Sequence, residues 1–162
     1  MTLSKHRIVE ITIWLVTVTS WVVYIEPSLT DALMLGFILI SMLLFGVQIV
    51  QNNFLLGVLL LGYISFELIA IVNAINDTAH AARFSLITNY LMFFMYFLSG
   101  MLKLNGERIF KCLMDGWVLA ALFSSLVAIL GFMDIIPKNL VMKNDEGFRM
   151  HAFFKDPNVY GP

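Results

Sequence analysis

Long apolar runs separated by short polar stretches make up most of this chain. Five of the runs are long enough to cross a bilayer as helices, which takes about 20 residues. They cover residues 8–24, 32–50, 54–72, 84–102 and 116–136. The polar breaks include Gln51-Asn52-Asn53, which is short enough to predict a tight antiparallel hairpin, and the stretch 103–111, which predicts a loop. The pattern therefore predicts an all-α membrane protein with five transmembrane helices and the start of a sixth.

The last part of the chain predicts an outer loop over residues 137–156, followed by another helix from residue 157. Asp156 before Pro157 is typical of a helix start, because Asp caps free backbone N–H groups and Pro suits the first turn. We expect residues 1–162 to form one transmembrane helical region, the N-terminal part of a longer protein whose sixth helix is cut short. A small membrane subunit that ends naturally at Pro162 is the alternative.

Composition agrees with a membrane protein. The apolar fraction is 60%, the charged fraction 13% and the mean hydropathy +0.87, against about 45–50% apolar and about 25% charged in soluble domains. A net charge of −1 provides no basic surface for nucleic acid. The single cysteine, Cys112, is predicted at the start of the fifth helix and excludes a disulfide framework. His6, His80 and His151 have no metal-binding spacing, so we expect neither a metal nor a cofactor.

The positions of Lys and Arg predict the orientation, because cytoplasmic loops are enriched in them. Lys5 and Arg7 precede the first helix, and Lys103, Arg108 and Lys111 lie between the fourth and fifth, on the same side. The predicted outer segments carry an equal number once the tail is counted: Arg83, Lys138, Lys143, Arg149 and Lys155. Because early helices usually dominate, we expect a multi-pass protein of the bacterial inner membrane with its N-terminus in the cytoplasm.

Glu67 is the polar candidate inside the membrane. An acidic side chain at the centre of a bilayer costs about 2.5–3.5 kcal/mol on insertion scales. One interpretation is a contact for a proton or a substrate. The other is a neutral or hydrogen-bonded glutamate that fixes helix packing, with Asn89 or a serine as partner. Glu10 is interpreted as a structural charge near the cytoplasmic end of the first helix, where headgroup water is within reach. Asp115 is interpreted as an interfacial charge near a helix start, where the helix dipole favours an anion.

The tail GFRMHAFFKDPNVYGP concentrates polar residues among aromatic ones. The forked guanidinium of Arg149 suits phosphate groups, and exposed N–H groups at a helix start bind anions. An outer pocket for a lipid-linked phosphate is therefore one interpretation. Pairing of Arg149 with nearby acids, or with lipid headgroups, is the other.

Residues 149–162 resemble the R-x-x-G-x-F-x-(D/N)-P-N-x-x-(G/A) signature of the O-antigen ligase and O-antigen polymerase superfamily. The resemblance assigns contact with the donor diphosphate to Arg149. The matching framework positions are Phe154, Asp156, Pro157, Asn158 and Gly161. Ala152 replaces the usual glycine, and the large later periplasmic loop that carries the family's catalytic basic residues is absent, so the catalytic residues are unknown.

The resemblance implies a glycosyltransferase that joins an undecaprenyl-diphosphate-linked glycan to a glycan or lipid acceptor during cell-surface polysaccharide assembly. These 162 residues alone are expected to be inactive. The alternative function is a polytopic transporter or flippase for lipid-linked glycans or other solutes, which Glu67 would suit. Membrane lipids are partners in either case.

Overall fold

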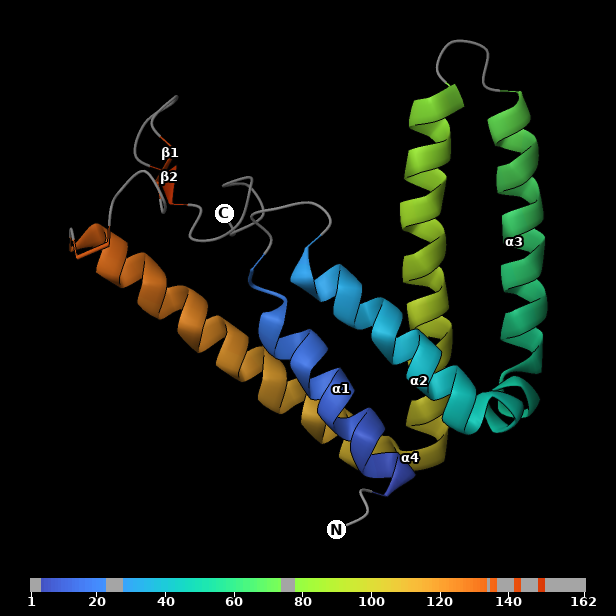
Figure 1. Ribbon diagram of the computed structural model, residues 1–162, viewed down its shortest axis with the longest axis horizontal. Coiled ribbons are helices and arrows are strands. Elements are labelled where there is room, and N and C mark those ends of the chain that lie inside the picture. The colour runs from blue at the N-terminus through green and yellow to red at the C-terminus, as the bar shows by residue number, and fades with distance from the viewer. Residues whose placement is uncertain are drawn as a thin grey trace. The chain divides into compact units, whose positions relative to one another are not determined.

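The computed structural model describes residues 4–22, 28–73, 78–133, 135–136, 142–143 and 149–150. Figure 1 shows its helices, which are α1 (Lys5–Thr19), α2 (Leu29–Asn52), α3 (Phe54–Val72) and α4 (Thr78–Phe132). Within the predicted outer loop, β1 (Met142–Lys143) pairs with β2 (Arg149–Met150) as a short antiparallel ladder. Apart from this ladder, the described elements are helices, as the sequence predicts.

Three helical stretches in the described part of the chain are long and apolar enough to cross a membrane. They are Leu29–Asn52, Phe54–Val72 and Ala81–Phe132. The first predicted helix is shorter in the structure, because α1 has 15 residues where a crossing takes about 20. The structure therefore has the apolar helices of a membrane protein, but it does not show the predicted five crossings. The predicted sixth helix, from residue 157, lies outside the described residues.

The prediction of a loop at residues 103–111 is wrong, because α4 continues through them. Lys, Arg and Glu form helices readily, so a run of charges marks contact with water without ending the helix. Asn105 nevertheless has non-helical backbone angles, φ −151° and ψ 55°, and kinks α4. A straight helix of 55 residues would be about 80 Å long, far more than the roughly 30 Å of hydrocarbon in a bilayer.

Two residues consequently occupy other positions than the sequence predicts. Cys112 and Asp115 both lie in the helical interior of α4, whereas the prediction put them near the start of a separate helix. Asp115 therefore does not meet the free N–H groups of a first turn. The polar stretch 103–111 does interrupt the helix, but only as a kink at Asn105, several residues before Cys112.

The start of α2 follows from its capping residues. The backbone N–H of Asp31 donates to Oγ of Ser28 at 3.2 Å, and the backbone N–H of Ser28 donates to Oδ2 of Asp31 at 2.7 Å. This reciprocal pair satisfies two N–H groups that a helix start leaves without partners. The polar residues that separate the first two apolar runs thus define where the second helix begins.

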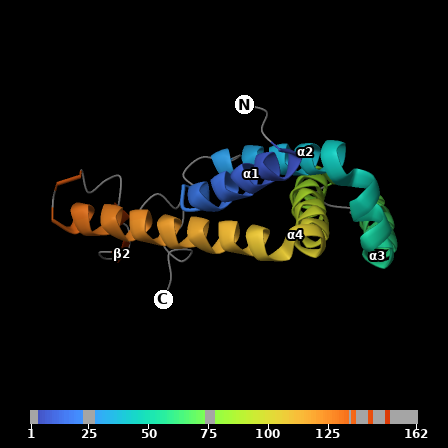
Figure 2. The same cartoon turned by 90° about the horizontal axis from the view of Figure 1, so that it is seen from below.

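The chain forms two compact units, residues 1–34 with 110–162, and residues 35–109. In the first unit, α1 lies along the second part of α4 (Figures 1 and 2). Val9, Ile13 and Val16 are buried on α1, at the spacing of one helix face. Gly116 of α4 lies so close to α1 that a Cβ atom there would collide with the side chain of Thr17. The absence of a side chain at Gly116 is what lets the two helices approach.

In the second unit, α3 lies beside the first part of α4 and not along α2, so the predicted hairpin of the second and third helices is wrong (Figures 1 and 2). Asn53, between α2 and α3, is buried and donates from Nδ2 to the carbonyl of Tyr96 on α4 at 3.3 Å. A Cβ atom at Gly100 of α4 would lie 2.5 Å from Cγ2 of Ile49. Both helices on either side of Asn53 are therefore held against α4.

Replacing Gly116 with alanine tests the packing of α1 on α4. We expect Gly116→Ala to lower the stability of the protein by about 1–3 kcal/mol, because the new methyl group overpacks the contact with Thr17. The measurement is thermal or denaturant unfolding in detergent or lipid. Gly62→Ala is the matched control, since nothing lies within 4 Å of a Cβ atom at Gly62. Equal stability of the two variants would contradict the close approach.

Candidate functional site

α3 presents mostly apolar side chains to its surroundings. Phe66 is 75% exposed, Leu68 59% and Val72 83%, which suits contact with lipid chains. Glu67 is the charged residue of this helix. A carboxylate in such a setting requires hydrogen-bond partners from the protein, because hydrocarbon supplies none.

Three donors surround the carboxylate of Glu67. The hydroxyl of Tyr63 donates to Oε1 at 2.6 Å. The hydroxyl of Ser85 and the side-chain amide of Asn89 donate to Oε2 at 2.7 Å and 2.6 Å. The Nδ2 atom of Asn89 also lies 3.1 Å from Oγ of Ser85, to which it donates. We call these four residues the Glu67 cluster.

Helix periodicity explains how the cluster forms. Tyr63 and Glu67 are four residues apart on α3, as are Ser85 and Asn89 on α4, so each pair occupies one face of its helix. The two faces meet because α3 lies beside the first part of α4 (Figures 1 and 2). The carboxylate therefore ties α3 to α4 through two hydrogen bonds, with Tyr63 as a third donor from its own helix.

The predicted partners of Glu67 are confirmed, since Asn89 and a serine, Ser85, both donate to it. Sequence reasoning missed Tyr63. Its position one helical turn before Glu67 was the available signal, because residues at this spacing are neighbours on a helix surface.

Two cavities adjoin the cluster from opposite directions along the helices. One has a volume of about 310 Å³ and is lined by residues towards the α3–α4 connection: Glu67, Ala70, Ile71, Ala81, Phe84 and Ser85. The other, of about 480 Å³, extends the other way and has an almost wholly apolar wall: Leu56, Leu59, Leu60, Tyr63, Met92, Met95, Tyr96 and Ser99. Glu67 faces the first cavity and Tyr63 the second, so the cluster lies between them.

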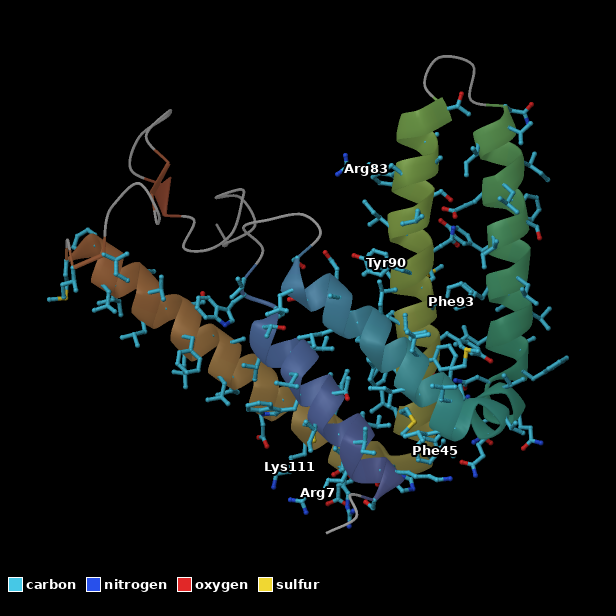
Figure 3. All side chains as sticks on the ribbon, in the orientation of Figure 1. Arg7, Phe45, Arg83, Tyr90, Phe93 and Lys111 are labelled. Carbon is cyan, nitrogen blue, oxygen red and sulfur yellow. The ribbon has the colours of Figure 1, made fainter. Side chains whose placement is uncertain are left out.

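No cationic side chain pairs with Glu67 in the part of the chain that the structure describes. Figure 3 shows Arg83 on the side of α4 that faces away from α3. The carboxylate is therefore held by neutral donors, and its charge is not balanced by an ion pair within these residues.

Two of the cationic residues that predict the orientation lie at the same end of the first unit. Figure 3 shows Arg7 of α1 and Lys111 of α4 at that end. In the second unit, Nζ of Lys103 donates to the backbone carbonyl of Asn52 at 2.9 Å. A cation there stabilises the end of α2, because the last carbonyls of a helix carry partial negative charge.

The structure leaves the predicted donor site undescribed. The backbone of Arg149 begins β2, opposite Lys143 of β1, but the placement of its side chain lies outside the description. The framework positions lie wholly outside the described residues: Phe154, Asp156, Pro157, Asn158 and Gly161. The assignment of Arg149 to a diphosphate stays a prediction.

Known proteins provide no further assignment, because no family model, curated protein or solved structure matches the chain. Within the described residues, no three His, Cys, Asp or Glu side chains gather at a metal-binding distance. The Glu67 cluster is therefore the candidate site that the described residues provide.

A double-mutant cycle measures the link between the two helices. Glu67→Gln, Asn89→Leu and the double variant are compared by unfolding in lipid or detergent. We expect a coupling energy of about 0.6 kcal/mol, rising to about 1.7 kcal/mol for a strong pair, as for other hydrogen bonds between membrane helices. Glu67→Gln with Thr88→Val is the control pair, because the hydroxyl of Thr88 donates to its own helix at Phe84. Additive effects in the Asn89 cycle would contradict the contact.

Proposed function

We propose that this chain contributes the donor-binding part of a polytopic membrane glycosyltransferase of the O-antigen ligase and polymerase type. The tail motif carries this assignment: Arg149 precedes Phe154, the triplet Asp156-Pro157-Asn158 and Gly161. The enzyme would transfer glycan from an undecaprenyl-diphosphate donor to a glycan or lipid acceptor during cell-surface polysaccharide assembly.

The chemistry explains why an arginine would be placed there. Transfer breaks the bond between the anomeric carbon of the glycan and the diphosphate oxygen. The acceptor oxygen forms the new bond to that carbon, and its proton is released to the departing diphosphate or to water. Negative charge grows on the departing diphosphate, and a guanidinium offsets it with two parallel N–H donors. Arg149 would thus hold the donor in place and stabilise the leaving group without a metal or cofactor.

The layout of the helices supports a multi-pass arrangement. In the proposed topology α1, α2, α3 and the two parts of α4 on either side of Asn105 make five crossings. The N-terminus lies in the cytoplasm of a bacterial cell and the tail on the outer face of its inner membrane. The shared position of Arg7 and Lys111 at one end of the first unit supports this orientation, because both then face the cytoplasm.

A transporter or flippase for lipid-linked glycans or other solutes is the second candidate. The Glu67 cluster favours it, since acidic side chains inside membrane helices often mark a substrate or proton pathway. A transporter would lose translocation in Glu67→Gln, whereas the transferase would lose glycan transfer in the Arg149 variants.

Substitution of Arg149 tests the proposed transferase. The full-length protein is expressed in cells whose own gene is deleted. Arg149→Ala is expected to reduce glycan transfer at least 100-fold relative to the wild type, because loss of one charge-stabilising donor typically costs about 2.7–4 kcal/mol of transition-state stabilisation. The measurements are glycan on the acceptor, the lipid-linked intermediate that accumulates, and the amount of protein in the membrane. Arg149→Lys is expected to restore only part of the transfer, because an ammonium lacks the planar fork.

Lys138→Ala is the matched control, since it removes one cation from the same predicted loop but lies outside the motif. We expect it to retain transfer. Normal transfer by Arg149→Ala at normal membrane levels would refute the role of Arg149. An equal loss in both variants would attribute the effect to the charge of the loop as a whole.

A further inference from the structure

We propose that Glu67 is a reversible proton-binding site inside the membrane, in which the side-chain amide of Asn89 turns over when the carboxylate takes up a proton. This role goes beyond glycan transfer and does not depend on Arg149. The ligand is a proton supplied by water on one side of the membrane.

The arrangement of donors around Glu67 suits the ionised form. An ionised carboxylate only accepts hydrogen bonds, and Tyr63, Ser85 and Asn89 all donate to Glu67. The charge itself has no cationic partner among the described residues. Because an unbalanced charge in hydrocarbon is costly, a proton is the simplest cation to remove that cost.

The amide of Asn89 is the group that can adapt to the neutral form. Its Nδ2 atom donates to both Glu67 and Ser85, while its Oδ1 atom is buried and has no hydrogen-bond partner. A half-turn about the last side-chain bond would exchange the two atoms. Oδ1 would then accept the new O–H of Glu67 and the hydroxyl of Ser85.

The far side of the amide does not oppose this turn. In the ionised form the amide oxygen, with its two lone pairs, is unpaired, and in the neutral form the amide nitrogen, with its two N–H groups, is unpaired. An unsatisfied buried group costs about 1–3 kcal/mol whichever kind it is, so the two orientations are similar at that end. The protonation state of Glu67 therefore decides which orientation is the more stable.

Among the side chains of the cluster, Glu67 is the one whose charge changes. Tyr63 faces it from α3, and Ser85 and Asn89 face it from α4, all of them as neutral donors. Arg83 points away from α3 (Figure 3). The side chain of His80, near the start of α4, lies outside the described residues.

A cavity supplies the route for the proton. The cavity of about 310 Å³ between Glu67 and the α3–α4 connection exceeds by far the roughly 30 Å³ that one water molecule occupies. Glu67 itself lines this cavity, whereas the cavity beside Tyr63 does not include Glu67 in its wall. Proton exchange is therefore expected from the side of the α3–α4 connection.

Infrared difference spectroscopy on the chain in lipid nanodiscs tests the site. We expect a protonated-carboxyl C=O band that grows as the pH falls, is lost in Glu67→Gln and remains in Glu107→Gln. Glu107 is the matched control, because it is an exposed glutamate of α4 outside the cluster. Asparagine labelled with ¹³C should show an amide band that shifts with the same pH midpoint, and Asn89→Leu should remove that shift.

Two results would overturn the inference. The first is the absence of a Glu67-dependent carboxyl band over the whole pH range in which circular dichroism shows the helices intact. The second is a Glu67 band that titrates while no asparagine band moves with it, which would leave Asn89 as a fixed structural donor. The band is assigned to Glu67 by its loss in Glu67→Gln, so circular dichroism must show that this variant keeps its helices.

Discussion

The absence of water in a bilayer is the constraint on which this structure depends. Backbone polar groups within the hydrocarbon must find their hydrogen-bond partners in the protein, and a charged side chain there is costly without partners. α3 is an apolar helix with one acidic residue, Glu67, and it meets that requirement only where Ser85 and Asn89 of α4 reach it. The polar cluster therefore depends on the pairing of the two helices, because Ser85 and Asn89 can donate to Glu67 only where α3 and α4 lie side by side.

Small residues and buried amides account for the remaining helix contacts. Gly116 lets α1 approach α4 in one unit, and Gly100 lets Ile49 approach α4 in the other. Asn53 adds a hydrogen bond from the α2–α3 junction to α4. Helices in lipid gain little from burying apolar surface against each other, so close backbone approach and a few polar contacts set how they pack.

The sequence predicted the apolar helices and the partners of Glu67 because hydropathy and helix periodicity are local properties. Sequence reasoning failed where the structure depends on contacts between residues far apart in the chain or on a single backbone kink. The charged stretch 103–111 predicted a loop, but its charged residues are good helix formers, and the helix is interrupted only by the kink at Asn105, beside Gly106. The predicted hairpin was inferred from the short connection alone, whereas α3 contacts α4 through Ser85 and Asn89, which are distant from it in the chain.

Accessibility of a spin label on α3 tests most directly whether Glu67 and its helix lie in hydrocarbon. Leu68→Cys, in a background with Cys112→Ser, would carry the label beside Glu67 at a side chain that is 59% exposed. Relaxation by oxygen, which concentrates in lipid, should greatly exceed relaxation by a water-soluble nickel complex. Stronger relaxation by nickel would place this face of α3 in water, and the need for the Glu67 cluster would disappear.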